Sequence, residues 1–509
     1  MTGRYPDEVD VAIVGSGPTG AAYARILTEI APEARIAMVE AGPVVTDPPG
    51  AHVKNIDDPE ARQDAQRRSQ GPAADEETVS SPGAVKSGFR RARPGTYLLE
   101  DGFAFPGEDG LPVAAMSANV GGMAAHWTGA CPRPGEGERI AFLDDLDELL
   151  AEAERLLGVT SGAFDATPFG DLIRERLAAA VDEGRAPEAR VQRMPLAVHR
   201  RPDGRLVWSG SDVVLGEATR SNPRFELLPE TVALRVLVEG GRAAGVEVRD
   251  ARTGETSTMR ARAVVVAGDA LRTPQLLWAS GIRPAALGRY LNDQAQIVFA
   301  VRIREAAEGE RAAAAAGSPK AGLSEYSGVT WVPYTDAQPF HGQVMQLDAS
   351  PVPLAEDDAV VPGSIVGIGL FCAKDVQADD RVEFDEARPD AYGLPGLAIR
   401  YRLTDRDREI LDAARARIVE LGRAVGEPLD AEPFSLPLGS SLHYQGTTRM
   451  GQADDGESVS DPDSQVWGVE GLFVAGNGVI PTPTACNPTL TSVALAVRGA
   501  RAAARIIAA

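Results

Sequence analysis

The sequence predicts an α/β fold with a second domain of α+β character, from three observations. Residues 9–42 read in turn as a strand, a glycine-rich turn, a helix and a second strand. Residues 258–279 repeat a strand, a turn and a helix far along the chain. Between residues 297 and 401, several short runs are apolar or alternate between apolar and polar residues, which is typical of an antiparallel sheet. We therefore expect a parallel sheet assembled from separated segments and a second, antiparallel sheet.

The first strand and its turn carry a G-x-G-x-x-G motif. Residues 9–14 form an apolar run rich in β-branched residues, typical of a buried parallel strand. Gly15 permits the tight turn, Gly17 lets a pyrophosphate approach the backbone, and Gly20 lets the next helix pack close to the strand. Glu40 lies about 20 residues past the last glycine, where a carboxylate holds ribose hydroxyls. The motif predicts dinucleotide binding without separating NAD from FAD, and a tight turn without a ligand is the alternative.

Size and composition indicate an ordinary globular protein. The 509 residues are enough for two or three domains, and a net charge of −22 argues against nucleic acid or an anionic membrane as a partner. The cysteines Cys131, Cys372 and Cys486 show no C-x-x-C spacing, so neither a disulfide framework nor a metal site is expected. The first strand follows Met1 closely and no run is apolar enough to span a bilayer. These features predict no signal peptide, no membrane segment and a cytoplasmic location.

The remaining elements follow from periodicity and from glycine and proline punctuation. Helices are expected at residues 21–30, 144–157, 169–180, 273–279, 405–425 and 487–507. Strands are expected at residues 9–14, 36–39, 190–196, 205–208, 225–228, 232–239, 244–249, 264–267 (with residues 258–263 leading into it), 297–303, 328–332, 343–347, 365–372, 397–401 and 471–476. Pro274 is expected near the first turn of its helix, where proline is tolerated. Residues 71–94 are polar and predict a long loop, either a lid over the substrate entrance or a disordered segment.

Two segments in the C-terminal third carry recognisable motifs. Residues 438–451 read LGSSLHYQGTTRMG, and residues 471–500 read GLFVAGNGVIPTPTACNPTLTSVALAVRGA. Together with the N-terminal glycine motif, they resemble the glucose–methanol–choline (GMC) family of FAD oxidoreductases, and the matching segments are spread from residue 9 to about residue 505. Residues 264–277, VVVAGDALRTPQLL, resemble the internal signature of the family, with Asp269 where a small residue is more usual. The resemblance implies the FAD-binding nucleotide fold of the family, joined to a substrate-binding domain with an antiparallel sheet.

Within the family, the chain resembles pyranose oxidases and related bacterial oxidases that act on glycosides. The segment VGGMAAHWTGACPRP is similar to their flavin-attachment segment, and LHYQGTTRMG and TACNPTLT are similar to their active-site segments. GRYLNDQ and QPFHGQVMQLDASPVP are similar to two further segments. The resemblance implies a mobile substrate loop in this chain at Asp348, Ala349, Ser350, Pro351, Val352 and Pro353.

His443 and Asn487, within these segments, are the predicted catalytic pair. Alcohol oxidation removes a hydroxyl proton, for which a histidine is a suitable base, and a carbon-bound hydride, which a flavin accepts. The amide of Asn487 has a donor and an acceptor with which to hold a substrate oxygen. The alternatives are a structural histidine and an asparagine that only opens the helix before Pro488.

The resemblance also implies the residues that contact FAD. His126 would either join the flavin covalently through a ring nitrogen or pack against the ring edge, and both possibilities stay open. Thr128 would lie near flavin N5 and O4, or be a strand threonine without a special contact. Val232 would offer backbone groups to the adenine, and Gly476 and Asn477 would approach the pyrophosphate or ribityl chain. The remaining histidines receive no role: His52, His199 and His341.

Two discontinuous domains are predicted. Residues 1–50, 106–170, 222–295 and 455–509 would bind FAD, and residues 51–105, 171–221 and 296–454 would bind the substrate. The implied reaction oxidises a secondary ring hydroxyl of a pyranose sugar or glycoside, at C2 or C3, and passes the electrons to O2, giving H2O2, or to a quinone.

Three alternatives to this function stay open. They are a quinone-dependent sugar dehydrogenase, a GMC oxidase of a non-sugar alcohol, and a flavin-binding protein without turnover. The expected partners are a small-molecule sugar or glycoside and O2 or a quinone, without nucleic acid, membrane or metal. A monomer or small homo-oligomer is predicted.

Overall fold

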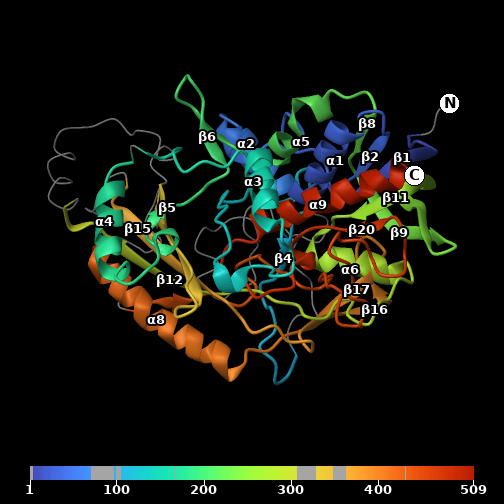
Figure 1. The fold of residues 1–509 in the computed structure, drawn as a ribbon. Helices are drawn as coiled ribbons and strands as arrows, with labels where there is room; N and C mark the ends of the chain where they lie inside the picture. Colours follow the sequence, from blue (N-terminus) through green and yellow to red (C-terminus); the bar gives the residue numbers. More distant parts are fainter. Residues whose placement is uncertain are drawn as a thin grey trace.

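Two seven-stranded sheets, one in each half of the molecule, organise the chain (Figure 1). The structure is a computed structural model that describes residues 4–69, 97–98, 105–165, 167–305, 328–347, 363–429 and 432–508. The first sheet lies on the right in Figure 1, beside helices α1 and α9, and the second lies on the left, above helix α8. The predicted lid at residues 71–94 and the predicted substrate loop at residues 348–353 lie outside the described residues.

The first sheet is assembled from segments that are far apart in the sequence. Its strand order is β8-β2-β1-β11-β10-β9, with β20 also paired to β11. The pairs among β8, β2, β1, β11 and β20 are parallel, whereas β10 runs antiparallel to both β11 and β9. The bounds are β1 Glu8–Val14, β2 Ile36–Val39, β8 Phe225–Leu228, β9 Thr231–Glu239, β10 Arg242–Asp250, β11 Thr256–Val266 and β20 Leu472–Val474.

Helices α1 (Pro18–Ile30) and α9 (Thr489–Ala508) pack together beside this sheet. Pro18 follows the N-cap Gly17, a position where the missing N–H of proline removes no helical hydrogen bond. The two helices approach closely because Gly499 has no side chain, since a Cβ there would lie 1.8 Å from Tyr23 Oη. Helices α3 (Leu146–Leu157) and α5 (Ser211–Arg220) complete this layer.

The second sheet is antiparallel throughout and is covered by helices. Its order is β18-β12-β15-β14-β13-β5, with β19 also paired to β12. The bounds are β5 Gln192–Arg193, β12 Ala295–Arg302, β13 Val329–Val332, β14 Phe340–Gln346, β15 Ile365–Cys372, β18 Glu427–Pro428 and β19 Phe434–Ser435. Helix α8 (Asp405–Val425) packs on β12 and β15, and α4 (Gly170–Val181) packs on α8. Thr404 and Asp407 cap α8 by accepting each other's backbone N–H.

Helix α6 (Asp269–Ala279) starts four residues before the predicted position, so Pro274 lies inside it. The side chain of Asp269, at φ +84°, accepts the N–H groups of Leu271 and Arg272 and so caps the first turn. A proline inside a helix leaves the carbonyl four residues earlier without its donor. Here Thr447 Oγ1 donates to the Ala270 carbonyl at 2.5 Å, which explains why the proline is accommodated.

Two predicted strands also differ from the structure. The run at residues 397–401 belongs to β17 (Pro395–Arg400), which pairs with β16 (Arg381–Pro389) in a separate two-stranded ribbon and not in the second sheet. Of residues 190–196, only Gln192–Arg193 form a strand. The shorter described elements are α2 Pro59–Arg68, β3 Tyr97–Leu98, β4 Ala115–Met116, β6 Val198–Arg200 and β7 Leu206–Trp208.

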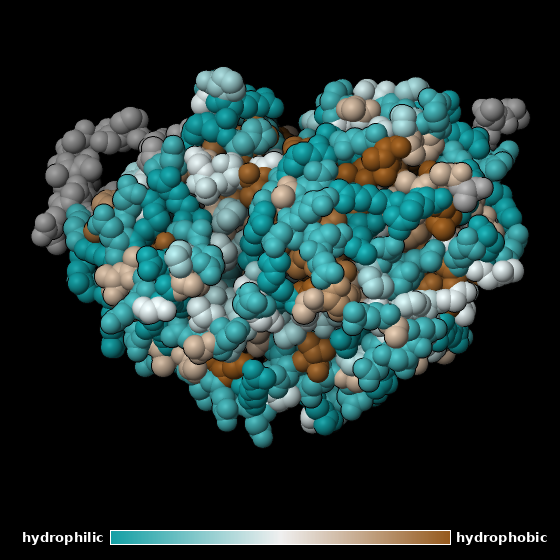
Figure 2. Space-filling model, in the orientation of Figure 1, coloured by the Kyte–Doolittle hydropathy of each residue, from teal (hydrophilic) through white to brown (hydrophobic). Residues whose placement is uncertain are grey.

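The face shown in Figure 2 is mostly hydrophilic, with small separate apolar patches. Among the described residues, Ile30 and Val238 are the large apolar side chains that are clearly exposed. Every helix in the described ranges is too short or too polar to cross a bilayer. The chain therefore directs its apolar residues into its two main cores and into the walls of internal cavities.

Candidate active site

A cavity of about 550 Å³ opens at the carboxyl ends of β1, β2 and β11. This edge is where α/β sheets bind their ligands. The cavity wall also holds both predicted catalytic residues, His443 and Asn487, and all but one of the predicted cofactor residues. Those on the wall are Gly15, Gly17, Glu40, His126, Thr128, Val232, Gly476 and Asn477.

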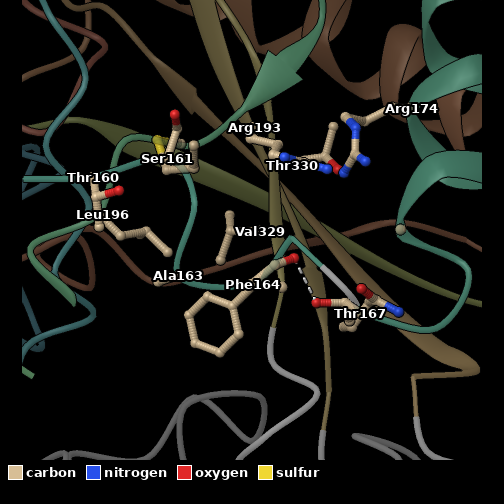
Figure 3. A pocket seen from close by; sticks show the side chains of 14 residues that line it. Thr160, Ser161, Ala163, Phe164, Thr167, Arg174, Arg193, Leu196, Val329 and Thr330 are labelled. Carbon is tan, nitrogen blue, oxygen red and sulfur yellow. Dashed lines mark hydrogen bonds between the residues drawn. The ribbon is translucent and has the colours of Figure 1, made fainter. Parts of the chain in front are cut away.

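A second recess beside the antiparallel sheet is too small to compete as a ligand site (Figure 3). Its volume is about 10 Å³, roughly the space that one water needs. Phe164 and Thr167 line it, and Thr167 Oγ1 donates to the Phe164 carbonyl at 2.8 Å. The larger cavity is therefore the candidate active site.

Three glycines shape the turn at the dinucleotide end of the cavity. Gly15 has φ +103°, and a Cβ there would lie 2.2 Å from the Ala267 carbonyl oxygen. A Cβ on Gly20 would lie 2.1 Å from the Gly15 oxygen, so the helix needs glycine in order to pack there. A Cβ on Gly17 would meet no atom within 4 Å, although Gly17 lies on the cavity wall. The protein therefore leaves open space at Gly17, which is the clearance that a pyrophosphate would use.

The Glu40 carboxylate is buried and bonded to the same turn. It accepts the hydroxyl of Ser16 at 2.7 Å and the N–H of Gly42 at 3.0 Å. Burial raises the pKa of Glu40, and these hydrogen bonds counteract part of that rise. The contact to a ribose hydroxyl stays a prediction, and the observed bonds fix the carboxylate at the end of β2.

The two ring nitrogens of His126 lie in different surroundings. Its Nδ1 is enclosed by protein and has no hydrogen-bond partner among the described residues. Its Nε2 lies 3.2 Å from Ser117 Oγ. Burial lowers the pKa of His126 to about 4, so the ring is neutral at physiological pH. Thr128, two residues on, is exposed to the cavity.

The ring of His443 is oriented by Gln294. The amide nitrogen of Gln294 donates to the Cys486 carbonyl at 2.8 Å, so its Oε1 is the atom that faces His443 Nδ1 at 2.7 Å. An amide oxygen only accepts, so Nδ1 carries the proton and Nε2 is the basic nitrogen of the neutral ring. Phe371 stacks on the ring with centroids 5.5 Å apart.

Asn487 is held on the other side of that basic nitrogen. Its Nδ2 lies 3.3 Å from His443 Nε2, and its Oδ1 accepts from Gln343 Nε2 at 2.6 Å. Gln343 in turn lies 3.3 Å from the Nε2 of His341, whose Nδ1 accepts the indole N–H of Trp331. Burial lowers the pKa of His341 to about 3, so the ring is neutral, and a hydrogen bond with the Asn487 side chain opposes this fall.

Glu138 clamps the turn that leads into Asn487. Its carboxylate accepts the N–H groups of Ala485 at 2.6 Å, Cys486 at 2.8 Å and Gly135 at 2.6 Å. Burial raises the pKa of Glu138, and these N–H groups oppose the rise. Cys486 is thus held at its N–H by Glu138 and at its carbonyl by Gln294, directly before Asn487, the predicted catalytic asparagine.

Comparison with known proteins identifies the family. Models described as GMC oxidoreductase match residues 140–296 and 377–496. The C-glycoside 3-oxidase of Arthrobacter globiformis is 72% identical over 98% of this chain and 95% of that protein. The chain belongs to the GMC oxidoreductase family. This confirms the resemblance found in the sequence and the predicted fold class.

Other relatives of this GMC oxidoreductase cover nearly the whole chain. The C-glycoside 3-oxidase of Microbacterium trichothecenolyticum is 69% identical over 98% of this chain and 96% of that protein. The pyranose 2-oxidase of Tricholoma matsutake is 32% identical over 97% of this chain and 93% of that protein. Among solved structures, pyridoxine 4-oxidase superposes with a TM-score of 0.63 at 19% identity, covering 97% of this chain and 99% of that one, which shows a shared fold.

FAD is the cofactor of this family, and the cavity of this GMC oxidoreductase fits it. The volume lies within the range of about 300–1,000 Å³ that is typical of small-molecule and cofactor sites. The clearance at Gly17 and the glycine turn suit a pyrophosphate, while His126, Thr128 and His443 line the same continuous cavity. In the described ranges, no group of three or more His, Cys, Asp or Glu side chains is placed to hold a metal ion.

Sequence reasoning missed several residues that position the pair. Gln294, Gln343, Glu138 and Phe371 received no role, and His341 was set aside. Gln294 and Gln343 lie inside segments that resembled the family, GRYLNDQ and QPFHGQ, so a signal was present in those two cases. His52 is a buried core histidine whose two ring nitrogens contact the backbone of Lys54 and Trp127, and His199 is half-buried on β6.

Proposed function

We propose that this GMC oxidoreductase oxidises the C3 ring hydroxyl of pyranose glycosides to a ketone, with FAD as the electron acceptor. The observation that carries the proposal is the pairing of His443 Nε2 with the Asn487 amide on the wall of the cavity. The relatives at 72% and 69% identity, both named C-glycoside 3-oxidase, support C3 over C2 and a glycoside over a free sugar.

His443 acts as the base in this proposal. Its Nδ1 proton is fixed by Gln294, so Nε2 accepts the proton of the substrate hydroxyl. As the ring becomes a cation, Nδ1–H still donates to the Gln294 oxygen, so proton uptake needs no rearrangement. Bound FAD supplies the hydride acceptor at flavin N5.

Asn487 holds the substrate oxygen in this arrangement. Its Oδ1 is engaged by Gln343, which leaves the Nδ2 group to donate toward the cavity and toward His443. A donor at this point stabilises the negative charge that develops on the oxygen as its proton leaves. Asn487 therefore orients the hydroxyl and assists its ionisation, while His443 takes the proton.

A substrate panel tests the proposed function. The flavin should bleach under anaerobic conditions with C-glycosides and O-glycosides faster than with free glucose, and the product should carry its ketone at C3 by NMR. A simple non-sugar alcohol serves as the control and should leave the flavin oxidised. Bleaching by the non-sugar alcohol alone, or a ketone at C2, would contradict the proposal. Failure of every alcohol would favour a flavin protein without turnover.

The flavin is covalently attached in this proposal, through His126 Nε2. Nδ1 is enclosed by protein, whereas Nε2 lies beside Ser117 on the cavity wall, so Nε2 is the nitrogen that we expect to form the bond. We expect the yellow colour to remain with the acid-precipitated protein and to pass into the supernatant in His126→Ala, with His199→Ala as the histidine control. A colourless pellet from the parent protein would reject the covalent bond and leave the FAD assignment intact.

O2 is the electron acceptor in this proposal, since the relatives are named oxidases. Oxygen consumption measured against quinone reduction with one glycoside separates an oxidase from a quinone-dependent dehydrogenase.

The three cysteines are free and buried, which suits the reducing cytoplasm. Sedimentation of the purified protein tests the predicted monomer or small homo-oligomer.

A further inference from the structure

A strained residue lies directly before the proposed base. Leu442 has φ +59°, a left-handed conformation that non-glycine residues seldom adopt. Asn and Asp tolerate it better because their side chains bond locally, and leucine has no such group. Strain of this kind persists only where the surroundings enforce it, and it concentrates at functional sites.

Ser441 spans this strained residue and connects it to a buried carboxyl group. The Ser441 hydroxyl accepts the N–H of His443 at 3.1 Å, which closes a small ring across Leu442. The same hydroxyl donates to Asp293 Oδ1. Asp293 is 1% exposed, and its own N–H and carbonyl are both bonded to the hydroxyl of the buried Tyr401.

The residue after Asp293 is Gln294, which orients the imidazole ring. One dipeptide therefore controls both parts of His443: Gln294 holds the ring, and Asp293 holds the backbone through Ser441. We propose that Asp293 is a positioning residue that, through Ser441, enforces the strained turn at Leu442 and so places His443 Nε2 at the substrate. This inference rests on the proposed role of His443 as the base.

The surroundings of Asp293 explain why its charge matters. Burial raises the pKa of Asp293 to about 7, while Ser441 and the N–H groups of Gln294, His443 and Gly439 lower it in part. The ionisable groups around it are His443, Tyr401 and, beyond the Tyr401 ring, Lys374 with its partners Asp380 and Asp407. We call the link from Asp293 through the Ser441 hydroxyl to the His443 N–H the brace. The ionised carboxylate is the stronger acceptor for Ser441, so the hydrogen bond in this brace becomes stronger as the pH rises past 7.

The same ionisation has a cost in stability whose sign can be worked out. Below about pH 7 the folded Asp293 is protonated, whereas the unfolded one is already ionised above its ordinary value of about 4. The unfolded state then binds fewer protons, so stability falls as pH rises through this window. Asp293→Asn cannot ionise, and its melting temperature relative to the parent should therefore increase between about pH 4 and pH 7 and level off above that range. This difference reports the buried state of the Asp293 carboxyl, and its effect on His443 is measured by the kinetic and NMR tests.

The first test compares Ser441→Ala and Asp293→Asn with the parent in stopped-flow flavin reduction. Misplacement by about 1 Å can cost about 100-fold in rate, so we expect the limiting rate to fall about 10- to 100-fold. The Kd for the glycoside and the FAD content should stay within about threefold of the parent, because Asp293 lies behind the cavity wall and the Ser441 hydroxyl is engaged by Asp293 and the His443 N–H. If the limiting rate falls by no more than about threefold in both variants, the loss is much smaller than expected and the inference is overturned.

The second test relieves the strain instead of the brace. Glycine adopts positive φ freely, so Ser441→Ala/Leu442→Gly should recover at least about tenfold of the lost rate relative to Ser441→Ala/Leu442→Ala. Both double variants lack the leucine side chain and differ by a single methyl group, which isolates the backbone effect. Equal rates in the two double variants would show that the strain at Leu442 does not place His443.

An NMR readout separates this inference from the proposed function. The chain has five histidines, so a spectrum of ¹³C-labelled histidine is simple, and His443→Ala assigns the relevant signal. The His443 signal should move in Ser441→Ala and in Asp293→Asn. It should return toward its parent position in the double variant Ser441→Ala/Leu442→Gly, while the His199 signal stays fixed. If no alcohol reduces the flavin, the proposed function fails while these shifts still decide whether the brace exists. An unmoved His443 signal would overturn the brace even in an active enzyme.

Discussion

Replacing His443 by alanine is expected to slow flavin reduction by a bound glycoside by about 10²- to 10⁴-fold, the usual contribution of a general base. The imidazole is built for this step, because Gln294 fixes the proton on Nδ1 and Asn487 lies beside the basic Nε2. The Kd of the glycoside should change much less, since Asn487 and the cavity wall remain. Reoxidation by a quinone should be nearly unaffected, because it does not involve the substrate proton.

Stopped-flow measurement of the two half-reactions decides this prediction. His199→Ala is the matched control, since His199 is half-buried on β6, away from the cavity. Added imidazole should restore part of the rate in His443→Ala, because the vacated space still faces Gln294 and Asn487. A loss of no more than about threefold in the rate of flavin reduction would be far smaller than the contribution expected of a general base. That result would assign the base to another group and leave His443 as a structural residue.

Local patterns were sufficient for the first strand, turn and helix of the first sheet, whereas the antiparallel direction of β10 beside β11 and β9 was not predicted. The apolar run before Gly15 and the glycine spacing after it predicted β1 and α1 closely, because a buried parallel strand and a phosphate turn each impose a sequence pattern. Pro274 was misplaced because the hydroxyl that satisfies the Ala270 carbonyl comes from Thr447, which is 177 residues away. The pairing of β17 with β16 depended equally on contacts that periodicity does not encode.

In the candidate site, too, local sequence patterns predicted some residues, whereas residues that act through distant contacts were missed. His443 and Asn487 lie in segments with a family pattern, so sequence alone selected them, although the structure is what brings their side chains to 3.3 Å. Glu138 was missed because two of the three backbone N–H groups that it accepts belong to the distant residues Ala485 and Cys486, and a lone glutamate leaves no pattern. Asp293 and Ser441 were missed because their role depends on the positive φ of Leu442, and the residue type leucine gives no sign of that backbone conformation.

The largest structural effect is expected from Gly15→Ala. A methyl group there would lie 2.2 Å from the Ala267 carbonyl oxygen, and φ +103° is unfavourable for alanine. The turn after β1 and the end of β11 would have to separate, at a cost on the order of 4–5 kcal/mol, the upper range for single substitutions. We expect Gly15→Ala to melt far below the parent even without FAD, or to accumulate as insoluble protein.

Gly17→Ala is the matched variant, two residues further on, and should behave differently. Its methyl group would meet no protein atom within 4 Å, and its backbone is extended at φ −65° and ψ 179°, so the FAD-free protein should melt near the parent temperature. The methyl group would occupy the clearance proposed for the pyrophosphate, so FAD affinity should fall about 100-fold, or about 2.8 kcal/mol. Flavin fluorescence titrations, made in a His126→Ala background so that the flavin can be removed, measure this loss. Equal FAD affinity in Gly17→Ala and its background would place the pyrophosphate elsewhere, whereas a large loss of FAD-free stability would make Gly17 a folding residue like Gly15.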